Sequence, residues 1–194
     1  MNGDYPPGAT PLTAEEDEGL IPSHITTRDE LNGLEQANIL EAEIWLSNRR
    51  RRSPVCNTTF LKTLHKRMFG QVWQWAGSYR QGDRNIGVHW PQISYQTEAL
   101  CRECDSRREH QSYPADEIAI RFHHELVSIH CFPNGNGRHS RLAADLLVSE
   151  LGGMRFSWGS TRVELAGEVR GQYIEALKRA DEREIAPLLA FART

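Results

Sequence analysis

The chain has 194 residues, a length that suits one compact domain with an apolar core and is short for two independent ones. Charged residues make up 25% of the sequence and the formal net charge is only −3, which excludes a uniformly basic nucleic-acid binder and a self-repelling acidic chain. No stretch approaches the roughly 18 apolar residues of a membrane span, and the first residues do not resemble a signal peptide, so we expect a cytoplasmic protein without a membrane partner.

The N-terminal part of the chain predicts an arm followed by a helix. Residues 1–24 are rich in proline, glycine and acids and lack a sustained apolar period, which predicts an extended arm. Residues 25–194 then predict a single domain. Its first element is a helix over 27–48, because Thr27 is a cap candidate followed by acidic residues and then by apolar positions at helical spacing.

Two short motifs bring other functions to mind. The run Arg49–Arg52 before Pro54 fits the cationic end of a helix, and a nucleic-acid patch is the weaker alternative because the whole chain is close to neutral. Cys101-x-x-Cys104 has the spacing of a zinc or redox pair, but no second pair accompanies it. Four scattered cysteines do not indicate a disulfide scaffold, so we interpret these two as residues on one helix face.

The middle of the chain alternates helices with one irregular segment. Apolar residues at helical spacing predict helices over 60–69 and 95–110. Between them, residues 78–93 place glycine, aspartate and asparagine among β-tolerant residues, which predicts an irregular β-hairpin. A further helix begins near Pro114 and has a buried stripe at intervals of four, four and three residues. That stripe consists of Ile118, Phe122, Leu126 and Ile129.

A glycine-containing loop joins this helix to the next one, which ends at Gly152. The C-terminal residues again show helical spacing, so the predicted fold class is mainly α, a helical bundle with one β-hairpin. In the loop, Gly135 and Gly137 allow positive φ and a close approach of the backbone to a ligand. Because a helix begins at the end of the loop, its unpaired N–H groups and its positive dipole end form an anion site, for which phosphate is the natural ligand.

Two arginines and a histidine lie close in sequence to this predicted anion site. Arg138 and Arg141 are three residues apart on the first turns of the helix and reach the same side, as two ligands of a polyphosphate would. His130 ends the preceding helix and, as a neutral imidazole, takes a proton from an attacking hydroxyl. Each of these features alone is ordinary, but together they predict a general base beside a phosphate cradle.

The sequence His130-Cys-Phe132-Pro-Asn134-Gly135-Asn-Gly-Arg-His-Ser-Arg141 resembles the signature HxFx[D/E]GNGRxxR of Fic (filamentation induced by cAMP) domain proteins. The stretches FHHELVSIHCFPNGNGRHSRLAADLL, GLIPSHITT and LLAFAR further resemble the Fic subgroup called mobile mystery protein B. The resemblance implies a Fic-type helical bundle with its core motif at 130–141 and a hairpin flap at 78–93 that docks the target protein by adding edge-strand hydrogen bonds.

The resemblance also implies an activity, the transfer of AMP from ATP to a Ser, Thr or Tyr hydroxyl of a target protein. His130 is then the catalytic base, and the remaining motif residues bind the nucleotide; these are Asn134, Gly135, Asn136, Gly137, Arg138 and Arg141. Mg²⁺ is expected with ATP. Asn134 stands where the family usually has Asp or Glu, and its neutral amide weakens the expected metal ligation.

Many Fic proteins carry an inhibitory helix with the pattern [S/T]xxxE[G/N], and residues 31–36 (LNGLEQ) match it in part. The resemblance implies that Glu35 contacts Arg141 and keeps the enzyme weakly active; the alternative is an ordinary exposed glutamate. Two other functions stay open. One is a catalytically weak, nucleotide-binding regulatory or toxin-like module, and the other is a different Fic-type reaction, such as UMP, phosphate or phosphocholine transfer or removal of AMP.

Overall fold

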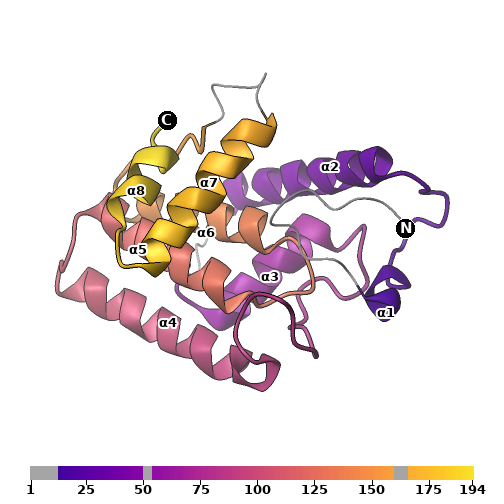
Figure 1. Cartoon of the computed structure of the whole chain (residues 1–194), viewed down its shortest axis with the longest axis horizontal. Coiled ribbons are helices and arrows are strands. Elements are labelled where there is room, and N and C mark those ends of the chain that lie inside the picture. The colour runs from indigo at the N-terminus through magenta and orange to yellow at the C-terminus, as the bar shows by residue number, and fades with distance from the viewer. Residues whose placement is uncertain (1–12, 50–53, 160–165) are drawn as a thin grey trace.

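The structure, a computed structural model, describes residues 13–49, 54–159 and 166–194. Within these ranges all regular elements are helices, and Leu20 and Trp73 form one isolated antiparallel β-bridge (Figure 1). No helix in the described ranges is both long and apolar enough to cross a membrane. The elements are α1 (Ala14–Asp17), α2 (Arg28–Ser47), α3 (Thr58–Phe69), the 3₁₀ turn η1 (Trp90–Gln92), α4 (Ile93–Glu109), α5 (Ala115–Ile129), α6 (Asn136–Glu150), α7 (Ala166–Asp181) and α8 (Ala186–Ala192).

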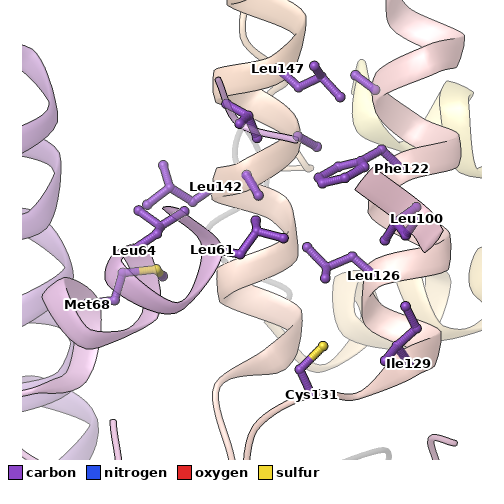
Figure 2. Close-up of a cluster of buried hydrophobic side chains, with 14 of the residues drawn as sticks. Leu61, Leu64, Met68, Leu100, Phe122, Leu126, Ile129, Cys131, Leu142 and Leu147 are labelled. Carbon is purple, nitrogen blue, oxygen red and sulfur yellow. The ribbon is translucent and has the colours of Figure 1, made fainter. Parts of the chain in front are cut away.

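Helices α5 and α6 occupy the centre of the molecule and pack against each other along their lengths, as Figure 1 shows. Helix α4 and the pair α7 and α8 contact α5, while α3 packs against α6 and carries α2 on its far side. The predicted stripe of α5 is buried at all four positions, which confirms the helical period. In Figure 2, Leu61 and Leu64 of α3 and Leu126 of α5 converge on α6, so the central helix is held from both sides.

Helix α2 confirms the helix that was predicted over 27–48. Thr27 caps it in a capping box: the Thr27 hydroxyl accepts from the Glu30 N–H, and the Glu30 carboxylate accepts from the Thr27 N–H. The arginine run follows its end, and residues 50–53 lie outside the described ranges. The Arg49 guanidinium lies over the Trp45 ring, 4.8 Å from its centroid, so this first arginine packs on the domain.

The predicted arm over 1–24 is described only from residue 13 onward. Here Ala14–Asp17 form α1, and the Ile21 N–H donates to the Val72 carbonyl at 2.9 Å. This second half of the arm is therefore attached to the connector that follows α3.

The predicted β-hairpin over 78–93, hereafter the flap loop, is wrong. These residues form bends and turns that end in η1, without a strand. The physical reason is that the carbonyls of Gly82 and Val88, which a hairpin would direct across a ladder, accept hydrogen bonds from the buried Arg80 guanidinium. A side chain thus organises the loop in place of cross-strand pairing.

The cysteines pair in a way that sequence spacing gave no reason to expect. Cys104 of α4 forms a disulfide with Cys56, which precedes α3 and lies 48 residues away in the chain, with a Cα–Cα distance of 6.4 Å. Cys101 is a buried free thiol on the same helix. The CxxC spacing therefore reflects two buried positions of α4 and does not form a pair of its own.

Candidate active site

His130 stands at the junction between α5 and the motif loop. It is the C-cap of α5 and has left-handed backbone angles, φ 56° and ψ 60°. The residue is only 7% exposed. Burial, assisted by the charges of Arg80 and Arg84, lowers the pKa of His130 to about 4. The imidazole is therefore neutral near pH 7, which is the state that a general base requires.

The side chain of Asn136 closes the loop between the two central helices. Its Oδ1 accepts from the Phe132 N–H at 2.9 Å, and its Nδ2 donates to the Phe132 carbonyl at 2.8 Å. Asn136 and Phe132 are both buried, so the Asn136 side chain takes the place of a backbone partner for the Phe132 N–H and for the Phe132 carbonyl. The sequence predicted nucleotide contacts by the backbone of Asn136 and missed this second role of its side chain.

The two glycines of the motif differ in conformation. Gly135 has φ +77°, and a Cβ there would meet the Phe69 ring at 2.6 Å, so both its backbone and its surroundings require glycine. Gly137 does not use the positive φ that glycine allows, because α6 begins at Asn136 and Gly137 lies in its first turn. A Cβ at Gly137 would meet only the Tyr173 hydroxyl, at 3.9 Å, so the missing side chain leaves the end of α6 uncovered.

The N-terminus of α6 lies where the sequence predicts an anion site. Its first intrahelical hydrogen bond runs from the His139 N–H to the Gly135 carbonyl at 2.9 Å, and no side chain caps the helix. The N–H groups of Asn136, Gly137 and Arg138 precede that bond, and the helix dipole adds positive potential at the same place. An oxyanion such as a phosphate satisfies both features.

Arg138 and Arg141 both extend from the first turns of α6. The Arg138 guanidinium lies over the Phe69 ring, 4.9 Å from its centroid. The Arg141 guanidinium lies 5.5 Å from the centroid of the Tyr173 ring, and its Nε donates to the Gly137 carbonyl at 3.3 Å. Burial lowers the pKa of Arg141, and the charge of Arg138 lowers it further.

Glu35 lies at this site, but its partner differs from the one predicted. The contact with Arg141 is wrong: Glu35 Oε2 lies 2.8 Å from Nη1 of Arg138. The alternative of an exposed glutamate is also wrong, since Glu35 is only 3% exposed. The Trp73 indole explains the geometry, because its Nε1–H donates to Glu35 Oε1 at 2.7 Å and leaves Oε2 directed at the first turn of α6.

His65 of α3 contacts the motif loop. The sequence did not distinguish this histidine from the apolar residues around it on α3. The Gly77 N–H donates to its Nδ1 at 3.0 Å, so the proton of the neutral ring must lie on Nε2, which donates to the Asn134 carbonyl at 3.0 Å. Its ring also stacks on Phe132 at a centroid distance of 3.8 Å. Burial holds the pKa of His65 well below its usual range.

Asn134 is the position at which the family signature has a carboxylate. Its Oδ1 accepts the N–H of Gly135, so the side chain supports its own loop. Among the described residues, no group of three or more His, Cys, Asp or Glu side chains is placed to hold a metal ion. At this position the chain offers a neutral amide oxygen, which is a weaker ligand for Mg²⁺ than a carboxylate.

We expect stability to fall steeply below neutral pH, because four buried histidines are held neutral. Burial lowers the pKa of His123 to about 3, that of His130 and His139 to about 4, and that of His65 well below 6.5. The unfolded chain takes up these protons first as the pH falls below 6.5. The free energy of unfolding should then drop by about 1.4 kcal/mol per pH unit for each histidine until the folded pKa is reached.

Thermal unfolding between pH 7.5 and 5 measures this effect. His139→Gln is the matched variant, because an amide still donates to the Leu61 carbonyl that His139 Nε2 contacts at 2.9 Å but does not titrate. Its melting temperature should depend less steeply on pH. A melting temperature that stays constant from pH 7 to 5 would contradict the expectation.

The segment that carries this site matches a known protein family. The model of the Fic/DOC family matches residues 55–148, which include the whole motif from His130 to Arg141. Residues 55–148 form a domain of the Fic/DOC family. The predicted Fic resemblance is thereby confirmed, while the subgroup of mobile mystery protein B stays a prediction.

Relatives and solved structures agree with this assignment. Over 133 residues the chain is 29% identical to the protein adenylyltransferase Fic of Drosophila mojavensis and 31% identical to that of Drosophila virilis. Each alignment covers 66% of this Fic chain but only 25% and 26% of the respective relatives. The chain thus spans about a quarter of the length of the curated relatives it matches.

Solved Fic structures share the fold at low sequence identity. The N-terminal Fic domain of a VirB-translocated Bep effector protein from Bartonella quintana superposes with a TM-score of 0.71 at 15% identity, covering 92% of this chain and 91% of that one. BepC from Bartonella tribocorum, crystallised with AMPPNP, gives 0.69 at 15% identity and covers 93% and 97%. Fic-1 from C. elegans gives 0.69 at 19% identity and covers 91% and 51%.

Proposed function

We propose that this Fic protein is a protein adenylyltransferase, which transfers AMP from ATP to a Ser, Thr or Tyr hydroxyl of a target protein. The observation that carries the proposal is the juxtaposition of a buried, neutral His130 with the uncapped N-terminus of α6 and its two arginines. The names of the Drosophila relatives and the AMPPNP bound in the BepC structure support the same chemistry.

The residues divide the reaction between them. His130 removes the proton from the target hydroxyl, and the oxygen forms a bond to the α-phosphorus of ATP as the bond to the β-phosphate breaks and pyrophosphate leaves. The N–H groups at the start of α6 hold phosphate oxygens, and Arg138 and Arg141 stabilise the charge on the departing group. The site acts mainly by orientation and by fixed charge.

Magnesium enters this proposal together with ATP, as part of the substrate. Asn134 contributes at most a carbonyl oxygen, whereas Mg²⁺ prefers carboxylates and phosphate oxygens. The nucleotide phosphates are therefore the main ligands that the ion finds at this site.

The target protein docks on the flap loop. Strand addition does not suit the observed loop, because its carbonyls accept from Arg80 and the Trp90 N–H donates to the Asp83 carboxylate at 2.8 Å. Exposed side chains of the loop can still contact a target protein: Ile86 is 44% exposed and Trp90 is 41% exposed. We propose that these two apolar side chains contact the segment that carries the acceptor hydroxyl.

Glu35 restrains the enzyme in this proposal. Its carboxylate occupies Arg138, one of the two cations that would otherwise bind the phosphates of ATP. This ion pair, between a buried Glu35 side chain and an Arg138 side chain that is 30% exposed, keeps Arg138 from its substrate until α2 moves or the ATP phosphates displace the carboxylate.

ATP that carries a label at either the α- or the γ-phosphate tests the proposed reaction. We expect the α-label, and not the γ-label, to become attached to protein when the purified chain is incubated with bacterial lysate and Mg²⁺. Transfer of the γ-label would indicate phosphate transfer and overturn the proposal. Binding of ATP without transfer of either label would favour the second candidate, a nucleotide-binding regulatory module, for which Asn134 is the supporting observation.

A further inference from the structure

Arg80 carries a buried charge that the proposed reaction has not used. The residue lies in the flap loop and is only 2% exposed. A guanidinium has five N–H donors, and inside a protein each needs an acceptor. Here Nε donates to the His130 carbonyl at 2.7 Å, Nη1 donates to the Gly82 carbonyl at 2.7 Å, and Nη2 donates to the Val88 carbonyl. One side chain thus connects two points of the flap loop, Gly82 and Val88, to the end of α5.

Backbone hydrogen bonds also join the flap loop to the end of α5. The Arg80 N–H donates to the Cys131 carbonyl at 3.0 Å, and the Val88 N–H donates to the Ile129 carbonyl at 3.3 Å. The carbonyls that Arg80 and Val88 use therefore come from three consecutive residues at the junction of α5 and the motif loop. This junction contains the left-handed residue His130, a conformation that persists only where its surroundings hold it.

We infer that Arg80 is a positioning residue for the transfer reaction: its guanidinium fixes the flap loop to the end of α5 and so sets the position of the His130 imidazole relative to a hydroxyl presented on that loop. The role in catalysis rests on the proposed function, whereas the attachment itself does not. Because a general base must lie within hydrogen-bonding distance of the hydroxyl, a shift of about 1 Å at this junction lowers the rate about a hundredfold.

Gly87 offers a second way to disturb the same contact. It has φ +96°, and a Cβ there would meet His130 Cβ at 2.6 Å, Arg80 Nη2 at 2.8 Å and the Ile129 carbonyl oxygen at 3.1 Å. Gly87→Ala therefore pushes the flap loop away from both His130 and the Arg80 guanidinium, and so disturbs the same junction without removing the arginine. The residue lies in an exposed part of the loop, so the helical core should fold unchanged.

Arg80→Lys tests the inference, because lysine keeps the charge but cannot span three carbonyls. Arg107→Met is the control, since Arg107 is a similarly covered arginine whose partners are the carboxylates of Glu103 and Glu125. We would measure kcat for AMP transfer, the Kd for ATP, amide hydrogen exchange over residues 81–89 and the pKa of His130 by NMR. The last two need neither ATP nor a target protein.

In Arg80→Lys we expect kcat to fall about a hundredfold with an unchanged Kd for ATP. Exchange over 81–89 should become faster, and the pKa of His130 should rise as the loop exposes the ring; Arg107→Met should change none of these. A folded Arg80→Lys variant with wild-type exchange, His130 pKa and kcat overturns the inference. If Arg80→Lys does not fold, the same measurements on Gly87→Ala decide whether the junction between the flap loop and α5 sets the position of His130. If the wild type transfers no AMP, the proposed function fails, while exchange and the His130 titration still decide whether Arg80 fixes the junction.

Discussion

Replacement of His130 by alanine should lower the rate of AMP transfer about a thousandfold and leave ATP binding nearly unchanged. General-base catalysis contributes roughly 10²–10⁴ to a rate, and the neutral, buried imidazole at the end of α5 is the group placed to supply it. The phosphate contacts of the proposed function come instead from α6 and do not involve this side chain. The measurement is transfer of α-labelled AMP to protein under saturating ATP, together with the Kd for ATP.

The left-handed backbone at this position requires care in the choice of variants. Alanine is disfavoured at φ 56°, whereas asparagine tolerates it, so His130→Asn separates loss of the base from strain in the loop. His124→Ala is the control on the same helix, since His124 contacts Asp181 at 2.8 Å and is not part of the site. Wild-type transfer by the folded His130→Asn variant would exclude His130 as the base.

Replacement of Glu35 by glutamine should raise the affinity for ATP about tenfold or more, with a matching gain in transfer. The variant removes the charge that pairs with Arg138, and a hydrogen bond to a charged group contributes about 1.5–3 kcal/mol. Glutamine still presents an oxygen to the buried Trp73 indole, so the packing of α2 is kept. Titration calorimetry with ATP and the label assay measure the two effects.

Glu35→Gly tests the same contact at a cost in stability. It leaves the Trp73 N–H buried without its acceptor, which should lower the free energy of unfolding by about 1–3 kcal/mol while activity rises as in the glutamine variant. Glu43→Gln on the same helix removes an exposed pair with Arg155 and should change neither quantity. If both Glu35 variants bind ATP like the wild type, the carboxylate does not restrain the enzyme.

Local patterns in the sequence predicted most of the helical fold. Apolar positions at helical spacing identified α2 to α8, because each helix buries one stripe, and the cap at Thr27 set the start of α2. The glycines, arginines and His130 of the motif lie within twelve consecutive residues and the loop between α5 and α6 is short, so the sequence alone was enough to propose one site for them.

What the sequence failed to predict depends on contacts between distant residues. The flap loop has the composition of a hairpin, and only a buried arginine with a partner 50 residues away explains its actual form. Glu35 was placed on the correct helix but against the wrong arginine, because the choice depends on Trp73, 38 residues further along the chain. Likewise, nothing local distinguishes His65 from its apolar neighbours; its role appears only once Asn134 lies beside it.

The left-handed backbone at His130 has a consequence for how this protein can evolve. A residue other than glycine in this conformation costs about 1–2 kcal/mol relative to ordinary helical backbone. Selection for folding alone would therefore favour glycine at this position, whereas the proposed function supplies a reason to retain the histidine. A lineage that lost its need for transfer would be expected to lose His130 early, before the buried residues of the helical core begin to change.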